Sequence, residues 1–255
     1  MTHTTTPRLT LRERLEELKV PALEPAIEIA PRLWRVRTRG AYSYLALDDD
    51  ITLIDTGSPG SGRGILEAVR ALGRSPAEIR TILITHYHFD HVGGLAEIQQ
   101  HVSARAGIHV SEAPAVESDM SLPNPFMNPI LARLLDPYLE IRDPGSARID
   151  LRLRDGDELP GLGGIRVIHT PGHTPGSISL HFRELGAVLV GDALQYRFGQ
   201  LALPNRLFTQ DMDEAIGSIR KLARCDFETL CFSHYRPIEG IGDRELRKFV
   251  SGLLP

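Results

Sequence analysis

The stretch "TILITHYHFDHVGG", residues 81–94, places three histidines and an aspartate within six positions, directly after a run of apolar and β-branched residues. Buried polar side chains are unfavourable unless each of them finds a partner. Imidazole and carboxylate groups at this density are instead the donors that zinc-type ions prefer. The stretch therefore predicts a strand that leads the chain into a metal-binding loop.

The spacing within this loop suits two ions. The strand is expected to end near Thr85, and His86 and His88 alternate in the extended segment that follows, so both can point toward one ion. Asp90 and His91 come one step later, where the chain begins to turn, and can serve a second ion beside the first.

Four ligands shared between two ions leave both under-coordinated, so further donors are expected at the ends of other strands. His173 follows the strand "IRVIHT", Asp192 ends "VLVGDA" and His234 lies in "LCFSHYRP". Residues that follow strands in this way collect at one edge of an α/β sheet. These three side chains are therefore predicted to join the cluster.

The order of the predicted elements indicates an α/β fold. After the Pro-punctuated segment 20–31, strands are expected over 33–38, 41–48, 51–57 and 79–85, with an amphipathic helix over 64–73. Strand, helix and strand in this order form a βαβ unit, in which helices cover a sheet. The second half repeats the scheme more weakly, with short strands between 147 and 193, a helix over 212–224 and a strand over 229–234.

Two segments extend this scheme. Residues 8–20 are expected to form an N-terminal helical arm, because leucines recur at helical spacing behind a capping box of Thr10 and Glu13. Residues 111–145 are rich in proline and carry apolar residues without a strand pattern, which predicts short helices and turns in a substrate flap. A surface loop packed on its own side chains is the alternative for this segment.

The net charge, the apolar runs and the cysteines of the sequence indicate which kinds of partner and compartment to expect. A formal charge of -4 and a pI near 6.2 provide no basic field for a phosphate backbone, so nucleic acid is not expected as a partner. Apolar runs fall short of the roughly 18 to 20 residues of a membrane-spanning helix, and no signal-peptide pattern is present. Cys225 and Cys231 do not form a secreted disulfide framework. We therefore expect a cytoplasmic protein that acts away from membranes.

The complete set of donors resembles that of the metallo-β-lactamase superfamily, whose HxHxDH motif is intact here. Seven positions match the metal ligands of that family, and they are His86, His88 and His173 for the first ion, Asp90, His91 and His234 for the second, and Asp192 as the bridge between them. Asp55, in "LIDTG", matches the family's strand-end aspartate, which orients the ligand loop. The resemblance implies a single domain over residues 1–255, folded as an αβ/βα four-layer sandwich of two mixed β-sheets flanked by helices.

The resemblance also implies a hydrolase with two divalent metal ions, most simply zinc, although iron, manganese and cobalt accept the same ligands. A hydroxide that bridges the two ions would attack a carbonyl carbon. Asp90 would relay a proton to the leaving group, and Tyr196 would donate a hydrogen bond to the oxyanion. Tyr87 is the alternative oxyanion donor.

Within the family, the compact lactonase and esterase-like group fits best. Asp192 argues against class B β-lactamases, and glyoxalase II enzymes usually add a glutathione-binding region beyond the last ligand. We expect a lactone or ester substrate, such as an acyl-homoserine lactone, whose apolar acyl part contacts the flap residues Leu122, Phe126, Met127, Ile130, Leu134 and Tyr138. The alternatives are a glyoxalase-II-like thioester hydrolase, a mononuclear iron persulfide dioxygenase and a domain that keeps metals for stability only. Homodimerisation through the arm or the flap stays open.

Overall fold

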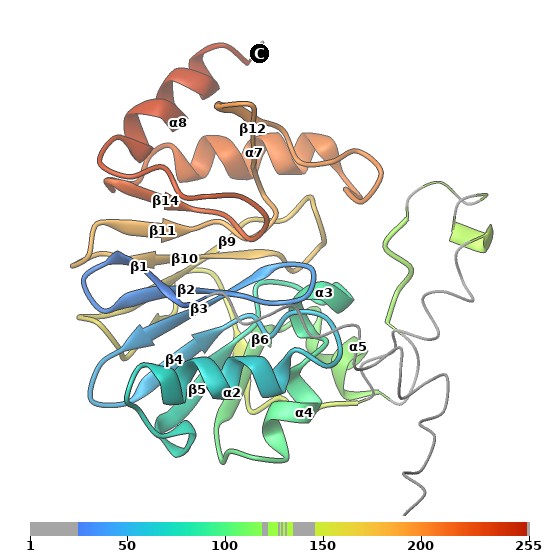
Figure 1. The fold of residues 1–255 in the computed structure, drawn as a ribbon. Coiled ribbons are helices and arrows are strands. Elements are labelled where there is room, and N and C mark those ends of the chain that lie inside the picture. The colour runs from blue at the N-terminus through green and yellow to red at the C-terminus, as the bar shows by residue number, and fades with distance from the viewer. Residues whose placement is uncertain are drawn as a thin grey trace, which may run out of the picture.

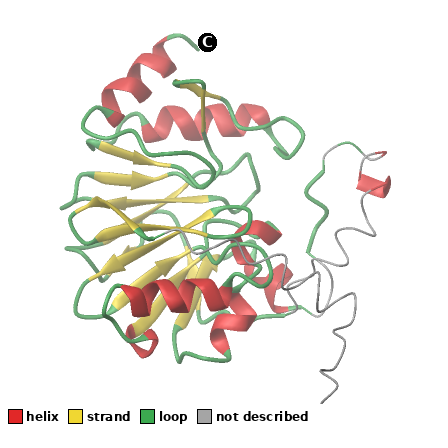
Figure 2. Cartoon of the chain, viewed as in Figure 1, coloured by secondary structure: helices red, strands yellow, loops and turns green. Residues whose placement is uncertain are grey.

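The computed structural model describes residues 25–118, 122–126, 128, 130, 132–134 and 146–253. The helical arm predicted over residues 8–20 lies outside this part of the chain, as do Met127 and Tyr138 of the predicted flap. The described strands form two central layers, with helices α2 and α4 on one outer side and α7 and α8 on the other (Figure 1). Figure 2 shows the same layers by type of secondary structure. The predicted α/β sandwich of two mixed sheets is confirmed.

The first sheet has seven strands in the order of the chain. They are β1 (Ile27–Ala30), β2 (Leu33–Arg37), β3 (Tyr42–Leu47), β4 (Ile51–Ile54), β5 (Ile79–Leu83), β6 (Arg105–His109) and β7 (Leu151–Leu153). Strands β1 to β4 pair antiparallel, and β4 to β7 pair parallel. Strand β1 was not expected, because Pro25 and Pro31 flank it; at a sheet edge, proline is tolerated.

The second sheet has five strands in the order β14-β11-β10-β9-β8. Their bounds are β8 (Glu158–Leu159), β9 (Ile165–His169), β10 (Ile178–Phe182), β11 (Ala187–Leu189) and β14 (Thr229–Cys231). The pair β11 and β14 is parallel and the other pairs are antiparallel. A separate hairpin of β12 (Gln195–Arg197) and β13 (Gln200–Ala202) follows β11.

Helices connect and cover these strands. They are α2 (Gly62–Ala71), η1 (Pro76–Glu78), α3 (Phe89–Val92), α4 (Leu95–Gln99), α5 (Ala113–Glu117), α7 (Met212–Leu222) and α8 (Gly242–Ser251). Helix α7 begins after the N-cap Asp211, which accepts a hydrogen bond from the backbone N–H of Glu214, and its last turn carries Arg220 and Lys221. An acidic start and a basic end both suit the helix dipole. None of the helices in the described part of the chain has the length and apolar character needed to span a bilayer.

The core between the sheets fixes how their strand ends meet. Tyr44, Ile54 and Leu83 of the first sheet share a buried cluster with Ile178 and Phe182 of the second. Full burial of each such side chain contributes roughly 1.5–3 kcal/mol. The sheets are thereby held face to face, and the loops that follow β4, β5, β9, β11 and β14 converge at one edge of the sandwich.

Candidate metal centre

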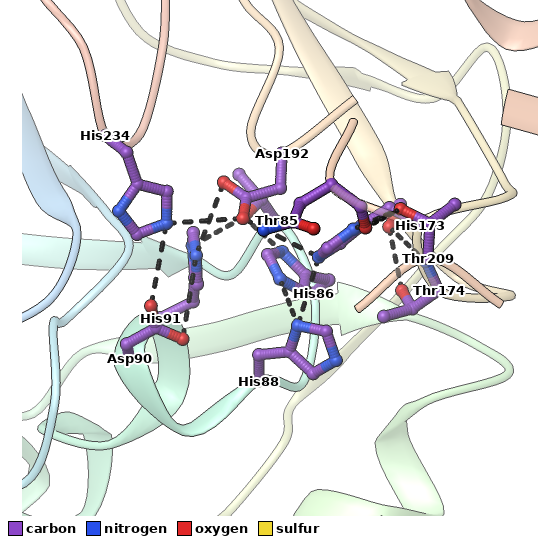
Figure 3. Close-up of polar contacts among 12 residues, drawn as sticks. Thr85, His86, His88, Asp90, His91, His173, Thr174, Asp192, Thr209 and His234 are labelled. Atoms are coloured by element: carbon purple, nitrogen blue, oxygen red, sulfur yellow. Dashed lines mark hydrogen bonds and ion pairs between the residues drawn. The ribbon is translucent and has the colours of Figure 1, made fainter. Parts of the chain in front are cut away.

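All seven predicted ligands come together at this edge (Figure 3). The loop after β5 carries His86 and His88, and helix α3 carries Asp90 and His91. The loops after the second-sheet strands β9, β11 and β14 carry the other three, which are His173, Asp192 and His234. Each half of the chain therefore contributes part of one cluster.

His86, His88 and His173 form a compact, buried group. Nε2 of His86 and Nε2 of His173 each lie 3.1 Å from Nδ1 of His88, and the three residues are 0%, 5% and 3% exposed. Ligand nitrogens about 2.0–2.1 Å from a tetrahedral zinc ion would be separated by roughly 3.3 Å. The geometry of the three nitrogens therefore fits a single ion.

Asp90, His91 and His234 form the second group. Nε2 of His234 lies 3.5 Å from Oδ2 of Asp90, and Nε2 of His91 lies 4.0 Å from Oδ1 of the same carboxylate. Nε2 of His91 is buried and has no hydrogen-bond partner in the described part of the chain. Buried nitrogens of this kind are rare unless a ligand satisfies them, which again suits a metal ion.

Asp192 lies between the two groups. Its Oδ2 is 3.6 Å from Nε2 of His173 and 3.2 Å from Nε2 of His234. Its Oδ1 is 3.6 Å from Nε2 of His91. One carboxylate thus faces histidines of both groups, and the seven residues as a whole fit two adjacent divalent ions.

Neighbouring polar groups set the orientation of the rings. The carboxylate of Asp55 accepts hydrogen bonds from the backbone and hydroxyl of Thr85, at 2.7 and 2.8 Å, and lies 2.8 Å from Nδ1 of His91. The Thr85 oxygen is also 3.1 Å from Nδ1 of His86. A proton on each Nδ1 leaves the Nε2 lone pair free for a metal ion. Asp55 therefore lies where the predicted orienting aspartate should be.

A polar contact at Nδ1 also orients the ring of His173. Its Nδ1 lies 3.4 Å from the hydroxyl oxygen of Thr209, which itself donates to the carbonyl of Asn205. The hydroxyl oxygen can therefore accept a hydrogen bond from Nδ1–H of His173, which leaves the Nε2 lone pair directed toward the centre. His88 differs, because its Nδ1 faces the other two rings.

The histidine pKa values shift in opposite directions in the two groups. Burial lowers the pKa of His86 and His88 well below the usual range, and neighbouring histidines add to the effect. Burial also opposes charge on His91, but the carboxylates of Asp55 and Asp192 outweigh it and raise its pKa to about 10. Asp192 likewise raises the pKa of His234.

A cavity of about 390 Å³ lies over the centre and is lined in part by its ligands. One set of lining residues is apolar and consists of Phe89, Pro125, Phe126, Leu194 and Phe208. A second set is polar and consists of Gln195, Arg197, Asn205 and Tyr235. Pro125 and Phe126 belong to the segment predicted as a flap, and the rings of Phe126 and Phe208 have centroids 5.1 Å apart.

The two candidate tyrosines are placed differently from the ligands. The ring of Tyr196 stacks on Phe232 and packs against the core beside it, while Gln195 and Arg197 line the cavity. Successive side chains of a strand face opposite sides, so this separation follows from the position of Tyr196 in β12. The structure therefore does not bring Tyr196 to the cavity. Tyr87 is buried, its hydroxyl accepts a hydrogen bond from Gln210, and burial raises its pKa to about 12.

Glu112, a buried carboxylate near the centre, was not predicted from the sequence. It is 2% exposed, and burial raises its pKa to about 7 despite the hydrogen bonds it accepts. Its position three residues after the end of the largely buried strand β6 could have indicated it, because Asp55 and Asp192 also follow strands.

Comparison with known proteins gives the family. The model described as "Metallo-beta-lactamase superfamily" matches residues 36–234, and the chain belongs to this superfamily. The probable metallo-hydrolase YflN of Bacillus subtilis is 33% identical over 74% of this chain and 76% of that protein. A hydroxyacylglutathione hydrolase of Cereibacter sphaeroides is 31% identical over 65% of this chain, but only 52% of its own length is covered. The predicted family is confirmed, and these relatives support a metal-dependent hydrolase.

Solved structures support the same fold. A metallo-beta-lactamase family protein from Thermus thermophilus has a TM-score of 0.68 and 22% identity, over 88% of this chain and 80% of that one. BJP-1, a subclass B3 metallo-beta-lactamase of Bradyrhizobium japonicum, has a TM-score of 0.67 and 21% identity, over 91% of both chains. At this level of identity the likeness concerns the fold alone.

Proposed function

We propose that the protein is a binuclear metal-dependent hydrolase that opens a lactone or ester bond. The observation that carries the proposal is the position of Asp192 between two groups of ligands, directly beneath an amphipathic cavity. Two divalent ions, most simply zinc, would activate water near neutral pH and polarise a carbonyl oxygen when they are bound there.

The residues around the centre have separate tasks. Three buried histidines, His86, His88 and His173, would hold the first ion. Asp192, whose carboxylate faces His173 and His234, would contribute a ligand to both ions. Asp90 is 23% exposed, lines the cavity and lies beside His234. A carboxylate in contact with both the cavity and the ligands can hold a proton and transfer it to the departing alkoxide.

The cavity walls indicate the shape of the substrate. An acyl chain packs against Phe126 and Phe208, where apolar surface is removed from water. A polar end faces Arg197, whose Nε donates a hydrogen bond to the hydroxyl of Tyr235 at 3.1 Å. Among the described residues no carboxylate pairs with Arg197, so its charge is available to a carboxylate on the substrate.

A thioester is the second candidate substrate. Three of the relatives are named hydroxyacylglutathione hydrolases, and they are 30% or 31% identical to this chain. The chain spans only 52% to 62% of the length of these relatives. Thioester hydrolysis uses the same attack on a carbonyl carbon, so the two candidates differ in the leaving group and in what binds it.

The test is metal content by elemental analysis of protein purified without chelator, paired with hydrolysis of matched acyl lactones, oxygen esters and thioesters. The proposal predicts about two ions per chain and turnover of lactones or esters. Faster turnover of the thioesters would replace the first candidate with the second. About one iron ion per chain, no hydrolysis and oxygen uptake with a persulfide would contradict both and indicate a dioxygenase.

A further inference from the structure

Glu112 is a buried carboxylate that the proposed chemistry does not use. It lies just beyond β6, at the N-terminal cap position of α5. Its Oε2 accepts a hydrogen bond from the backbone N–H of Tyr87 at 2.7 Å. Its Oε1 accepts one from the backbone N–H of Gly176 at 2.8 Å and another from the hydroxyl of Thr174.

These donors belong to the two loops that build the buried three-histidine group. Tyr87 lies between the two histidines of the HxH pair, in the loop that follows β5 of the first sheet. Thr174 directly follows His173, in the loop that follows β9 of the second sheet. Glu112 is therefore hydrogen-bonded to both loops at once, although it ligates nothing itself.

The fit around the carboxylate is close. A Cβ atom at Gly176 would lie 2.6 Å from Cγ of Glu112, so only glycine lets this loop come near enough to donate its N–H. Thr174 is fully buried, and its hydroxyl also lies 2.8 Å from that of Ser177. Buried, closely packed hydrogen bonds of this kind fix the separation of the two loops more tightly than solvent-exposed hydrogen bonds would.

We propose that Glu112 is a positioning residue that holds these two loops at the separation at which His86, His88 and His173 share one ion. The inference rests on the proposed metal centre and is independent of the substrate. Groups that orient metal ligands typically change metal affinity about 10- to 100-fold when they are replaced. We expect an effect of this size on the first ion.

Replacement of Glu112 by glutamine keeps the shape of the side chain and changes its hydrogen bonding on one side. When the amide oxygen accepts from Gly176 and Thr174, the amide NH₂ faces the N–H of Tyr87, and two donors meet. Glu112→Gln should therefore loosen the HxH loop selectively while the surrounding packing is retained.

The experiment compares Glu112→Gln with the wild type and with Glu97→Gln. Glu97 is a matched control, because its carboxylate also accepts two backbone N–H groups, those of Gly62 and Arg63, at 2.9 and 3.0 Å. Each protein is stripped with a chelator, checked for folding by near-ultraviolet circular dichroism, and titrated with zinc against a chromophoric chelator. The absorption spectrum of the cobalt-substituted protein reports the ligand geometry.

We expect Glu112→Gln to bind its tightest zinc ion about 10- to 100-fold more weakly than the wild type, with an altered cobalt spectrum. Hydrolysis should recover when zinc is added in excess, because the effect runs through the metal. Glu97→Gln should match the wild type in zinc affinity. Wild-type zinc affinity and cobalt spectrum in Glu112→Gln would overturn the inference, whereas a wild type that binds no ion would overturn the proposed function.

A second variant covers the case in which Glu112→Gln does not fold. Thr174→Val removes the hydroxyl donor to Glu112 and keeps the shape of the side chain and both backbone bonds. We expect it to weaken zinc binding by a smaller factor, with the same change in the cobalt spectrum. Unchanged affinity in Thr174→Val would then count against the positioning role.

Discussion

The two halves of the metal centre differ in burial and charge. In the three-histidine group the residues are at most 5% exposed, and burial lowers the pKa of His86 and His88. In the second group the side chains of Asp90 and His234 are 23% and 31% exposed, and the pKa of His91 is raised to about 10. The histidines of the first group are buried, and His86 and His88 are neutral at pH 7. The histidines of the second group must release protons before they bind a cation. We therefore predict that the first group would hold its ion tightly and that the second group would hold a labile ion.

The largest expected effect comes from the carboxylate that the two groups share. Asp192→Asn removes the charge between them, so we expect loss of the second ion and a decrease in kcat/KM of roughly 10³-fold. Metal analysis and ester hydrolysis measure both quantities, with Asp226→Asn, at an exposed carboxylate, as the control. Two-ion occupancy and full hydrolysis in Asp192→Asn would show that the residue is not a bridge.

The next effect is a selective response to pH. Because the folded-state pKa of His91 is about 10, one proton must leave when its Nε2 binds an ion at neutral pH. Affinity for the labile ion should therefore fall at least tenfold per pH unit, or at least about 100-fold from pH 8 to pH 6, because His234, whose pKa is also raised, must be neutral as well. The pKa values of His86 and His88 are lowered, so the tight ion should change little. Equilibrium dialysis at limiting zinc measures both, and equal loss of the two ions would contradict the comparison.

The same histidine has the opposite effect on the metal-free protein. A group whose folded-state pKa is raised contributes stability that is fully present below its unfolded pKa of about 6.5. That contribution is lost as the pH rises through about 10. Chelated protein should therefore lose thermal stability from this source as the solution becomes alkaline, the pH range in which zinc binding at His91 is strongest.

The smallest effect concerns the polar wall beside the second group. Arg197→Gln should lower kcat/KM about tenfold for a half-ester with a terminal carboxylate, such as mono-para-nitrophenyl adipate. Hydrolysis of para-nitrophenyl hexanoate, which lacks the charge, should stay nearly constant. Arg183→Gln is the control, because that arginine pairs with Glu158 away from the cavity. Equal changes for both esters would show that Arg197 does not select an anionic substrate.

Much of the centre could be predicted because its ligands follow strands. His173, Asp192 and His234 follow β9, β11 and β14 within a few residues, so the sequence could place them at the same edge, and the family resemblance assigned them to the two ions. The orienting role of Asp55 was implied by the family resemblance, and the hydrogen bonds it accepts from Thr85 and its contact with His91 match that role.

Other features depend on information that is not local. Tyr196 follows Asp192 closely, but the alternation of side chains along β12 turns its ring toward Phe232. The partners of Glu112 come from loops distant in sequence, so no spacing rule reveals them. Strand β1 is short and flanked by prolines, and its pairing with β2 outweighs the weak local preference.

The division of ligands between the two sheets has a consequence for biosynthesis. A nascent chain that has emerged through His91 holds four of the seven ligands, and His234 arrives only with the last strand of the second sheet. The long sequence separations mean that both sheets must close before the ligands meet. On the proposed function, metal uptake would therefore be a late step of maturation, in which the cation binds chains that have already folded and shifts their equilibrium further from the unfolded state. The supply of metal in the cell would then control how long finished molecules persist rather than how quickly they form.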